Sequence, residues 1–284
     1  MSFKKMRHFQ QRLIVSFISI IILFTLIYFS YFPPLIPVFA SIIALSIGIA
    51  QWEYYRIAQA KQYSPMIKLG ITTGVIYSLS VLIATQDPIF SFLPPMTLGL
   101  TFLFGFLYFF NNDSKPLANL AITLFGVAYI AIPVSTAISI NYFFPEGSLQ
   151  DGRLWLVYAL TTTKVTDAGA YFSGKLLGSR PLATHISPKK TIEGSIGGLA
   201  SAIVISCLFS LFSPLQIGFW DSIILGTVIG VLAQIGDLGE SLLKRDAGVK
   251  DSNELPGLGG MLDVLDSLIF TLPIVYFYLH LQNI

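Results

Sequence analysis

Long apolar segments, separated by short polar connectors, follow one another along almost the whole chain. We count nine candidate segments, each about 18–25 residues long, which is the length that a helix needs to cross a bilayer. They cover residues 13–32, 35–55, 66–85, 89–110, 117–142, 153–173, 194–213, 219–242 and 263–282. The pattern therefore predicts an all-α, polytopic integral membrane protein with about nine transmembrane helices.

The composition agrees with this prediction. Of the 284 residues, 54% are hydrophobic and only 11% are charged, whereas soluble domains contain roughly 25% charged residues. The net charge of +2 gives no reason to expect nucleic acid as a partner, and the lipid bilayer is the expected surrounding. Cys207 is the single cysteine of the chain, which excludes an intrachain disulfide and a multi-cysteine metal site.

Basic residues gather in alternate connectors, which predicts the orientation in the membrane. Four precede the first segment, and the connectors after the second, fourth, sixth and eighth segments are also basic. The intervening connectors carry a single base, Arg153. Positively charged connectors remain on the cytoplasmic side. We therefore expect a cytoplasmic N-terminus, a cell (plasma) membrane location, and both large polar connectors on the cytoplasmic side.

The two halves of the chain differ in their ionisable groups. Residues 1–150 form about five predicted helices with few charges, which we interpret as a transmembrane scaffold. Within them, Glu53 and Arg56 have the spacing of an ion pair at the membrane interface. Residues 151–284 form about four helices with polar cytoplasmic loops, and we interpret this part as catalytic.

Charged residues in the last third of the chain are candidates for function, because ionisable groups near a bilayer are costly to bury. Helical spacing places three of them, Asp237, Glu240 and Lys244, on one face of a helix together with Ser241. A polar connector with Lys250 and Asp251 follows, and the last segment begins with Asp263 and Asp266.

A second polar group lies upstream, around the sixth and seventh segments. Lys164 has the spacing of a partner for Asp167 within the sixth segment. The connector ISPKKTIEG begins with a turn signal at Ser187 and continues with Lys189 and Lys190. Glu193 then falls in the first turn of the next helix, where an acid is favoured, and the two lysines there are suited to an anion.

Carboxylates without histidines or thiols favour hard cations, above all Mg²⁺, which binds through one or two carboxylates and substrate phosphates. Neighbouring lysines and an arginine suit polyphosphate. At a cytoplasmic interface, these groups predict phosphoryl or nucleotidyl transfer between a soluble nucleotide and a lipid headgroup. The chain contains no Walker-type glycine loop.

The polar segment resembles the signature of the phosphatidate cytidylyltransferases, also called CDP-diacylglycerol synthases. The matching positions, in the order of the family pattern, are Ser241, Leu243, Lys244, Arg245, Lys250, Asp251, Pro256, Gly257, Gly259, Gly260, Asp263 and Asp266. Upstream, DAGAYFSGKLLG and ISPKKTIEGSIGG also resemble the family, and the likeness covers about residues 155–270. The chain departs from the pattern at Leu258, where the family has histidine, and at Val264, where it has arginine; Asn253 replaces a small residue.

The resemblance implies transfer of CMP from CTP to phosphatidic acid, giving CDP-diacylglycerol and pyrophosphate without a covalent enzyme intermediate. It implies Mg²⁺, with a second cation as an option, at Asp237, Asp263 and Asp266. Further catalytic candidates are Lys244, Lys250 and Asp251, and substrate-binding candidates are Ser187, Lys189, Lys190, Glu193, Asp167, Glu240, Ser241 and Arg245. A homodimer is an expectation at the level of the family.

Three alternatives stay open at this stage. One is a CTP-dependent transferase or kinase acting on an isoprenoid lipid, since acyl chains would meet only generic apolar walls. Another is a cation-coupled transporter that uses Asp167, Lys164 and Asp237 as a relay, although acids gathered at one face favour an enzyme. The third is an inactive relative, given Leu258 and Val264.

Overall fold

The computed structural model describes residues 18, 20–110, 115–249 and 260–282. Residues 20–28 are helical, and short 3₁₀ helices span Pro33–Leu35 and Pro88–Phe90. The helices are α2 (Ile36–Ala60), α3 (Ile67–Gln86), α4 (Leu93–Phe109), α5 (Pro116–Gly126), α6 (Ile132–Asn141), α7 (Gly152–Leu177), α8 (Ile192–Phe212), α9 (Phe219–Asp246) and α10 (Met261–Gln282). A π-helical turn, Val127–Ala131, joins α5 to α6 without a break in the helical path. The predicted all-α class is confirmed.

Seven helical stretches in the described part of the chain are long and apolar enough to cross a membrane. They are α2 with the turn before it, α3, α4 with the turn before it, α5 joined to α6, α8, α9 and α10. The helix α7 has 26 residues but is not among them, and most of the first predicted segment lies outside the described residues. An integral membrane protein is therefore confirmed, whereas the count of nine helices stays a prediction.

One connector forms strands that the sequence did not predict. Pro181–Ala183 (β1) and Ser187–Thr191 (β2) make a two-stranded antiparallel sheet, in which Pro181 pairs with Thr191 and Ala183 with Ser187. Thr191 ends the sheet and caps α8, because its side chain accepts a hydrogen bond from the N–H of Gly194. The hairpin thereby holds Lys189 and Lys190 against the start of α8.

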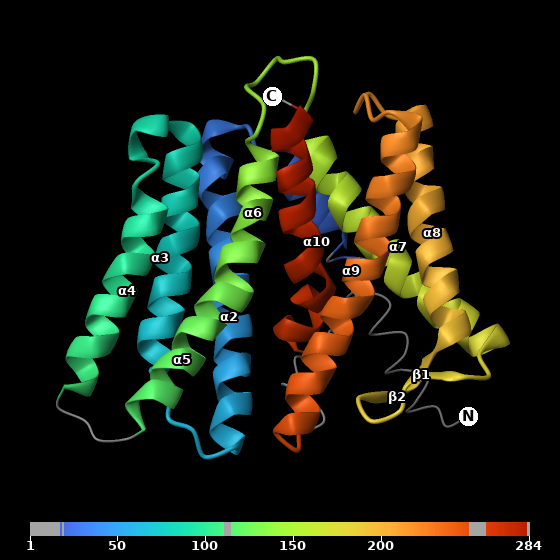
Figure 1. The fold of residues 1–284 in the computed structure, drawn as a ribbon. Coiled ribbons are helices and arrows are strands. Elements are labelled where there is room, and N and C mark those ends of the chain that lie inside the picture. Colours follow the sequence, from blue (N-terminus) through green and yellow to red (C-terminus); the bar gives the residue numbers. More distant parts are fainter. Residues whose placement is uncertain (1–17, 19, 111–114, 250–259, 283–284) are drawn as a thin grey trace.

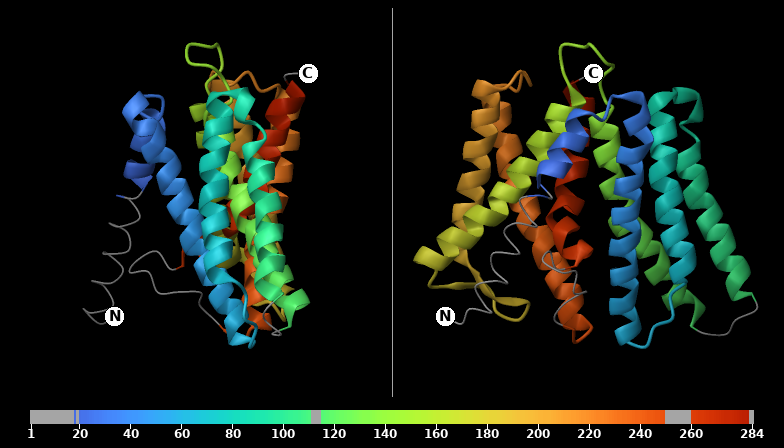
Figure 2. Two further views of the ribbon diagram at one scale, coloured as in Figure 1. Left: turned by 90° about the vertical axis from the view of Figure 1, so that its left-hand side faces the viewer. Right: turned by 180° about the vertical axis from the view of Figure 1, so that it is seen from behind.

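The helix α10 occupies the middle of the molecule, where it packs against α2, α6, α7 and α9 (Figure 1). The view from behind shows α3 and α4 at one edge and α7 and α8 at the other (Figure 2, right). Small residues let α7 and α8 approach closely: a side chain at Gly197 would overlap Ser173, and one at Gly169 would overlap Ser201. These small residues thus serve the packing of α7 against α8.

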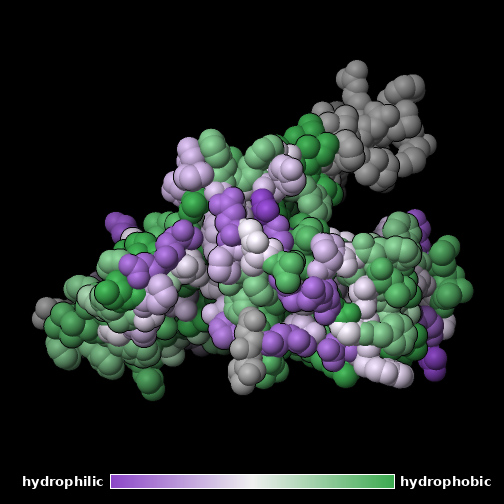
Figure 3. Space-filling model, turned by 90° about the horizontal axis from the view of Figure 1, so that it is seen from above, coloured by the Kyte–Doolittle hydropathy of each residue, from purple (hydrophilic) through white to green (hydrophobic). Residues whose placement is uncertain are grey.

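The two ends of the bundle differ in their polar groups. One end carries the β-hairpin, the connection between α2 and α3, and the last turn of α9 (Figure 1). We call it the hairpin end, and Lys61 forms an ion pair of 2.6 Å with Asp246 there. The opposite end carries the connection between α6 and α7. Seen from that end, hydrophilic residues cross the middle of the surface and hydrophobic residues flank them (Figure 3).

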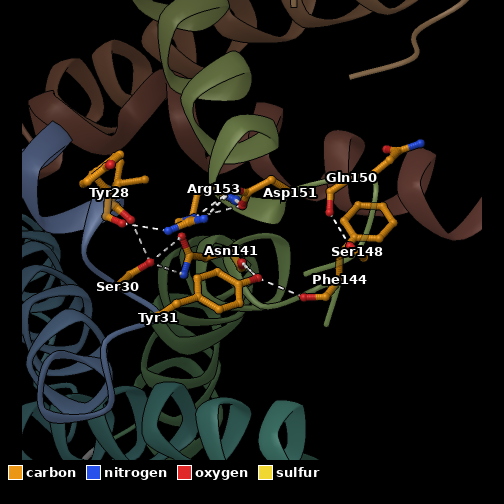
Figure 4. A network of polar contacts seen from close by, with 10 residues as sticks. Tyr28, Ser30, Tyr31, Asn141, Phe144, Ser148, Gln150, Asp151 and Arg153 are labelled. Atoms are coloured by element: carbon orange, nitrogen blue, oxygen red, sulfur yellow. Dashed lines mark hydrogen bonds and ion pairs between the residues drawn. The ribbon is translucent and has the colours of Figure 1, made fainter. Parts of the chain in front are cut away.

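Arg153 is the single base of the weakly charged connectors, and nearby groups neutralise its charge at that opposite end. Its guanidinium forms an ion pair of 2.7 Å with Asp151, donates to the carbonyl oxygen of Tyr28, and lies 4.7 Å from the ring centre of Tyr31 (Figure 4). The Tyr31 hydroxyl in turn donates to the carbonyl oxygen of Asn141 at 2.8 Å. The network fastens the segment before α2 to the start of α7.

Candidate active site

The polar face of α9 that helical spacing predicts lines a cavity of about 310 Å³ at the hairpin end of the bundle. The start of α10 supplies the facing wall, and α7 contributes one carboxylate. The lining residues are Asp167, Asp237, Glu240, Ser241, Lys244, Arg245, Asp263, Asp266 and Ser267. The structure therefore brings Asp237 and Asp263 to one cavity, as the sequence interpretation requires. We call this space the acidic cavity.

Lys244 holds two acids together on one side of the acidic cavity. Its ammonium group forms an ion pair of 2.8 Å with Glu240, one helical turn earlier, and a second, shorter ion pair with Asp263 of α10. The Glu240 and Lys244 side chains are only 3% and 10% exposed. The other oxygen of the Asp263 carboxylate accepts the N–H of Gly260 at 3.1 Å. Asp263 is thus oriented from two directions.

On the opposite side of the acidic cavity, side chains of α7 contact α10. The hydroxyl of Ser267 lies within hydrogen-bond distance of Asp167 at 3.2 Å and of Asp266 at 3.1 Å. Lys164 pairs with Asp167 at 3.4 Å, as its spacing predicts, and also donates to the carbonyl oxygen of Val264. Both members of this ion pair are partly exposed rather than buried.

Three carboxylates interact electrostatically with one another in this space. Asp266 is 5% exposed and lies within range of the charges of Asp237 and Asp167, and Asp167 is also within range of Asp237. Like charges gathered in this way repel one another unless a cation lies between them. Their oxygen-only donor set has the chemistry that Mg²⁺ prefers.

No preformed metal site is present among the residues that the structure describes, because no three acidic, histidine or cysteine side chains converge there on one point. Mg²⁺ characteristically takes one or two protein carboxylates and completes its shell with water and substrate phosphate. The donors of the acidic cavity therefore fit this ion on chemical grounds.

A second cavity, of about 370 Å³, adjoins the first and shares Asp167 and Asp237 with it. It lies between the end of α7, the β-hairpin, the start of α8 and the middle of α9, and we call it the lysine cavity. Its lining residues are Asp167, Ala170, Tyr171, Gly174, Lys175, Leu182, Lys189, Lys190, Thr191, Gly194, Ser195, Gln234 and Asp237. The lining combines three cations with apolar surface, including the exposed ring of Tyr171.

The ion pair between Lys190 and Asp237, at 2.7 Å, stands where the two cavities meet. The buried Lys190 ammonium nitrogen faces Asp237 without the angles of a hydrogen bond, and it makes no hydrogen bond elsewhere in the described part of the chain. An ammonium group has three N–H donors, and buried donors without partners are costly. Lys190 is therefore ready to bind an anion that enters the lysine cavity.

The remaining predicted site residues have diverse positions. Ser187 lies on β2, and Glu193 accepts hydrogen bonds from Ser179 and Arg180, so it fastens the chain before β1 to α8. Neither of them lines the two cavities. Arg245 lines the acidic cavity and donates to the carbonyl oxygen of Ile186 in the hairpin. Lys250, Asp251 and Leu258 lie outside the described residues.

Sequence reasoning missed several residues of these cavities, among them Ser267 and Lys175. Ser267 directly follows Asp266, but a hydroxyl on an apolar segment gives no distinctive signal. Lys175 is near the end of α7, where a cation suits the helix dipole, and this ordinary explanation concealed its place in the lysine cavity.

Comparison with known proteins gives a consistent result. The model of the cytidylyltransferase family matches residues 10–282. The chain is 33% identical over 293 residues to the phosphatidate cytidylyltransferase of Synechocystis sp., covering 94% of this chain and 95% of the relative. The enzyme of the same name from Chlamydia pneumoniae is 32% identical over 280 residues, with 95% and 91% covered. That from Bacillus subtilis is 45% identical over 143 residues, or 50% of this chain and 53% of the relative.

Proposed function

The chain belongs to the cytidylyltransferase family, and we propose that it transfers CMP from CTP to phosphatidic acid, forming CDP-diacylglycerol and pyrophosphate. The observation that carries the assignment of substrates is the pair of adjoining cavities, one acidic and one rich in lysine, that share Asp167 and Asp237. A transfer between two phosphates needs this arrangement, because both must lie side by side.

The acidic cavity receives the triphosphate of CTP in this proposal. Lys244 and Arg245 supply positive charge for its oxygens, and Ser241 supplies a hydroxyl donor. Asp263 positions Lys244 through their ion pair. Two of the carboxylates, Asp237 and Asp266, would hold Mg²⁺, with Asp167 and Asp263 beside them. When bound, this ion neutralises charge on the phosphates during transfer.

The lysine cavity receives the phosphate of the lipid. Lys175, Lys189 and Lys190 surround it, and the exposed Tyr171 and Leu182 offer apolar contact to the glycerol and acyl chains. A lipid phosphate oxygen attacks the α-phosphorus of CTP, a new P–O bond forms, and the bond to pyrophosphate breaks. A lipid phosphate bound to Lys190 would lie beside Asp237, its ion-pair partner, where the two cavities meet.

We place the hairpin end, and with it both cavities, on the cytoplasmic side of the plasma membrane. The basic residues Lys61, Lys115, Arg180 and Arg245 gather toward that end, and Asp151 neutralises Arg153 at the other. An impermeant maleimide tests the orientation after Cys207→Ala. A cysteine replacing Glu146 is labelled in intact cells, and one replacing Lys61 is labelled only after lysis. The reverse pattern refutes the orientation.

The activity itself is tested with purified protein in detergent. CTP labelled in the cytidine ring is incubated with phosphatidic acid and Mg²⁺, and label is expected in the lipid phase. Controls omit the lipid, replace it with diacylglycerol, or replace it with an isoprenoid phosphate. Product with the isoprenoid phosphate alone would reassign the lipid substrate, and no product with any lipid would refute the proposal.

A further inference from the structure

An acid from the N-terminal half of the chain caps the helix that carries two site carboxylates. Glu53 lies in α2, and its carboxylate is 0% exposed. One oxygen accepts the N–H of Met261 at 2.9 Å, and the other accepts the N–H of Leu262 at 2.8 Å. The sequence predicts an interfacial ion pair of Glu53 with Arg56. The structure buries Glu53, whereas Arg56 lies over the ring of Trp52 at 5.0 Å.

The local sequence explains why α10 needs a partner from elsewhere. The first N–H groups of a helix have no acceptor within the helix, and a side-chain oxygen at the preceding residue commonly serves them. Here the preceding residue is Gly260, which has no side chain. Glu53, which is 208 positions away from Met261, therefore supplies the missing acceptors, and its buried charge is compensated by these N–H groups and by the helix dipole.

The same turn of α10 orients the site. Asp263 is two residues beyond Met261, and its carboxylate accepts the N–H of Gly260 while it pairs with Lys244. We propose that Glu53 is a positioning residue for the reaction: by holding the first turn of α10, it keeps Asp263 and Asp266 directed into the acidic cavity. The helix α2 is then part of the catalytic apparatus rather than scaffold alone.

Glu53 also keeps substrate phosphate away from the N-terminus of α10. The free N–H groups and positive dipole of a helix N-terminus form a ready site for phosphate. At α10 this end is occupied by a carboxylate of the protein itself. Substrate phosphates therefore bind at Lys244 and Arg245 or in the lysine cavity. Because Lys244 and Arg245 lie on α9, the triphosphate stays on the α9 side of the acidic cavity.

The test uses Glu53→Gln in the full-length protein, with Glu146→Gln as the matched control. Gln has the same shape as Glu, but its amide nitrogen cannot accept the second N–H and its charge is lost. We expect kcat to fall on the order of 10- to 100-fold, with the KM values for CTP and phosphatidic acid changed less than about threefold. Glu146 is an exposed acid at the opposite end, and its substitution is expected to leave kcat unchanged.

Hydrogen–deuterium exchange gives a readout that does not depend on activity. In Glu53→Gln, exchange is expected to rise in peptides that contain Met261 and Leu262 and to stay unchanged in peptides from α4 and α8. A kcat within about twofold of the unsubstituted protein overturns the inference. So does a loss of kcat accompanied by faster exchange throughout the protein, because this indicates general unfolding.

If Glu53→Gln does not yield folded protein, Glu53→Asp replaces it. Asp keeps the charge but is one methylene shorter, so it reaches only one of the two N–H groups. A lower kcat at unchanged KM supports the inference, and an unchanged kcat overturns it. The kinetic arm rests on the proposed function. Failure of that function removes product from every variant, including the unsubstituted protein, whereas failure of the inference leaves product formation equal in all of them.

Discussion

Gly236 sets the distance between the two helices that build the acidic cavity, and its replacement by alanine tests how closely the site depends on that distance. Gly236 precedes Asp237 on α9 and faces the backbone of α10. A Cβ atom there would overlap the carbonyl oxygen of Asp266. It would also lie 3.0 Å from the carbonyl carbon of Asp266 and from the Cα of Ser267, whereas ordinary contact begins at 3.4 Å.

The obstructing atoms belong to backbone, so they cannot rotate away as a flexible side chain would. In Gly236→Ala, α9 and α10 must therefore separate by about 1 Å, and shifts of this kind cost about 1–3 kcal/mol. The expected fall in the thermal unfolding midpoint is about 2–10 °C. A displacement of about 1 Å within a reacting centre lowers turnover on the order of 100-fold, so kcat is expected to fall by about that factor.

Gly239→Ala is the matched control on the same helix. The nearest atom to its Cβ is the Tyr129 hydroxyl at 3.9 Å, so the methyl group fits. Alanine is also the better helix former, and the control is expected to be as stable as the unsubstituted protein or about 0.5–1 kcal/mol more stable. The assay is CMP transfer to phosphatidic acid, with thermal unfolding measured on the same samples. Equal kcat values for the two variants would refute the reasoning.

Three further predictions concern individual side chains. Asp263→Asn is expected to reduce transfer of label to lipid to background while the protein still inserts and purifies normally, and near-normal turnover would exclude its catalytic role. Lys244→Met leaves Glu240 buried without its cation, so the free energy of unfolding should fall by about 3–5 kcal/mol. Addition of Glu240→Gln should recover part of that loss, and equal stability of the single and double variants would contradict the ion pair. Lys175→Met is expected to raise the KM for phosphatidic acid about tenfold and leave that for CTP unchanged. Equal increases in both KM values would show that the lysine cavity is not specific for the lipid.

The sequence by itself determined the elements and one face of the site. Apolar segments must be helical in a bilayer because their backbone groups find hydrogen-bond partners only within the segment, so the helices followed from hydropathy. The polar face of α9 followed from the fixed turn of 3.6 residues, which places Asp237, Glu240 and Lys244 on one side whatever surrounds the helix. The start of α10, with Asp263 and Asp266, followed from the family pattern.

Only the tertiary structure decided which of these groups meet. The contact of Asp167 with Ser267, the ion pair of Lys190 with Asp237, and the cap that Glu53 gives to α10 all join different helices or a helix and the hairpin. Such pairs carry no spacing rule, because the rotation and separation of packed helices depend on every side chain between them. The residue that holds the start of the catalytic helix therefore lies in a half of the chain whose sequence indicates only a membrane scaffold.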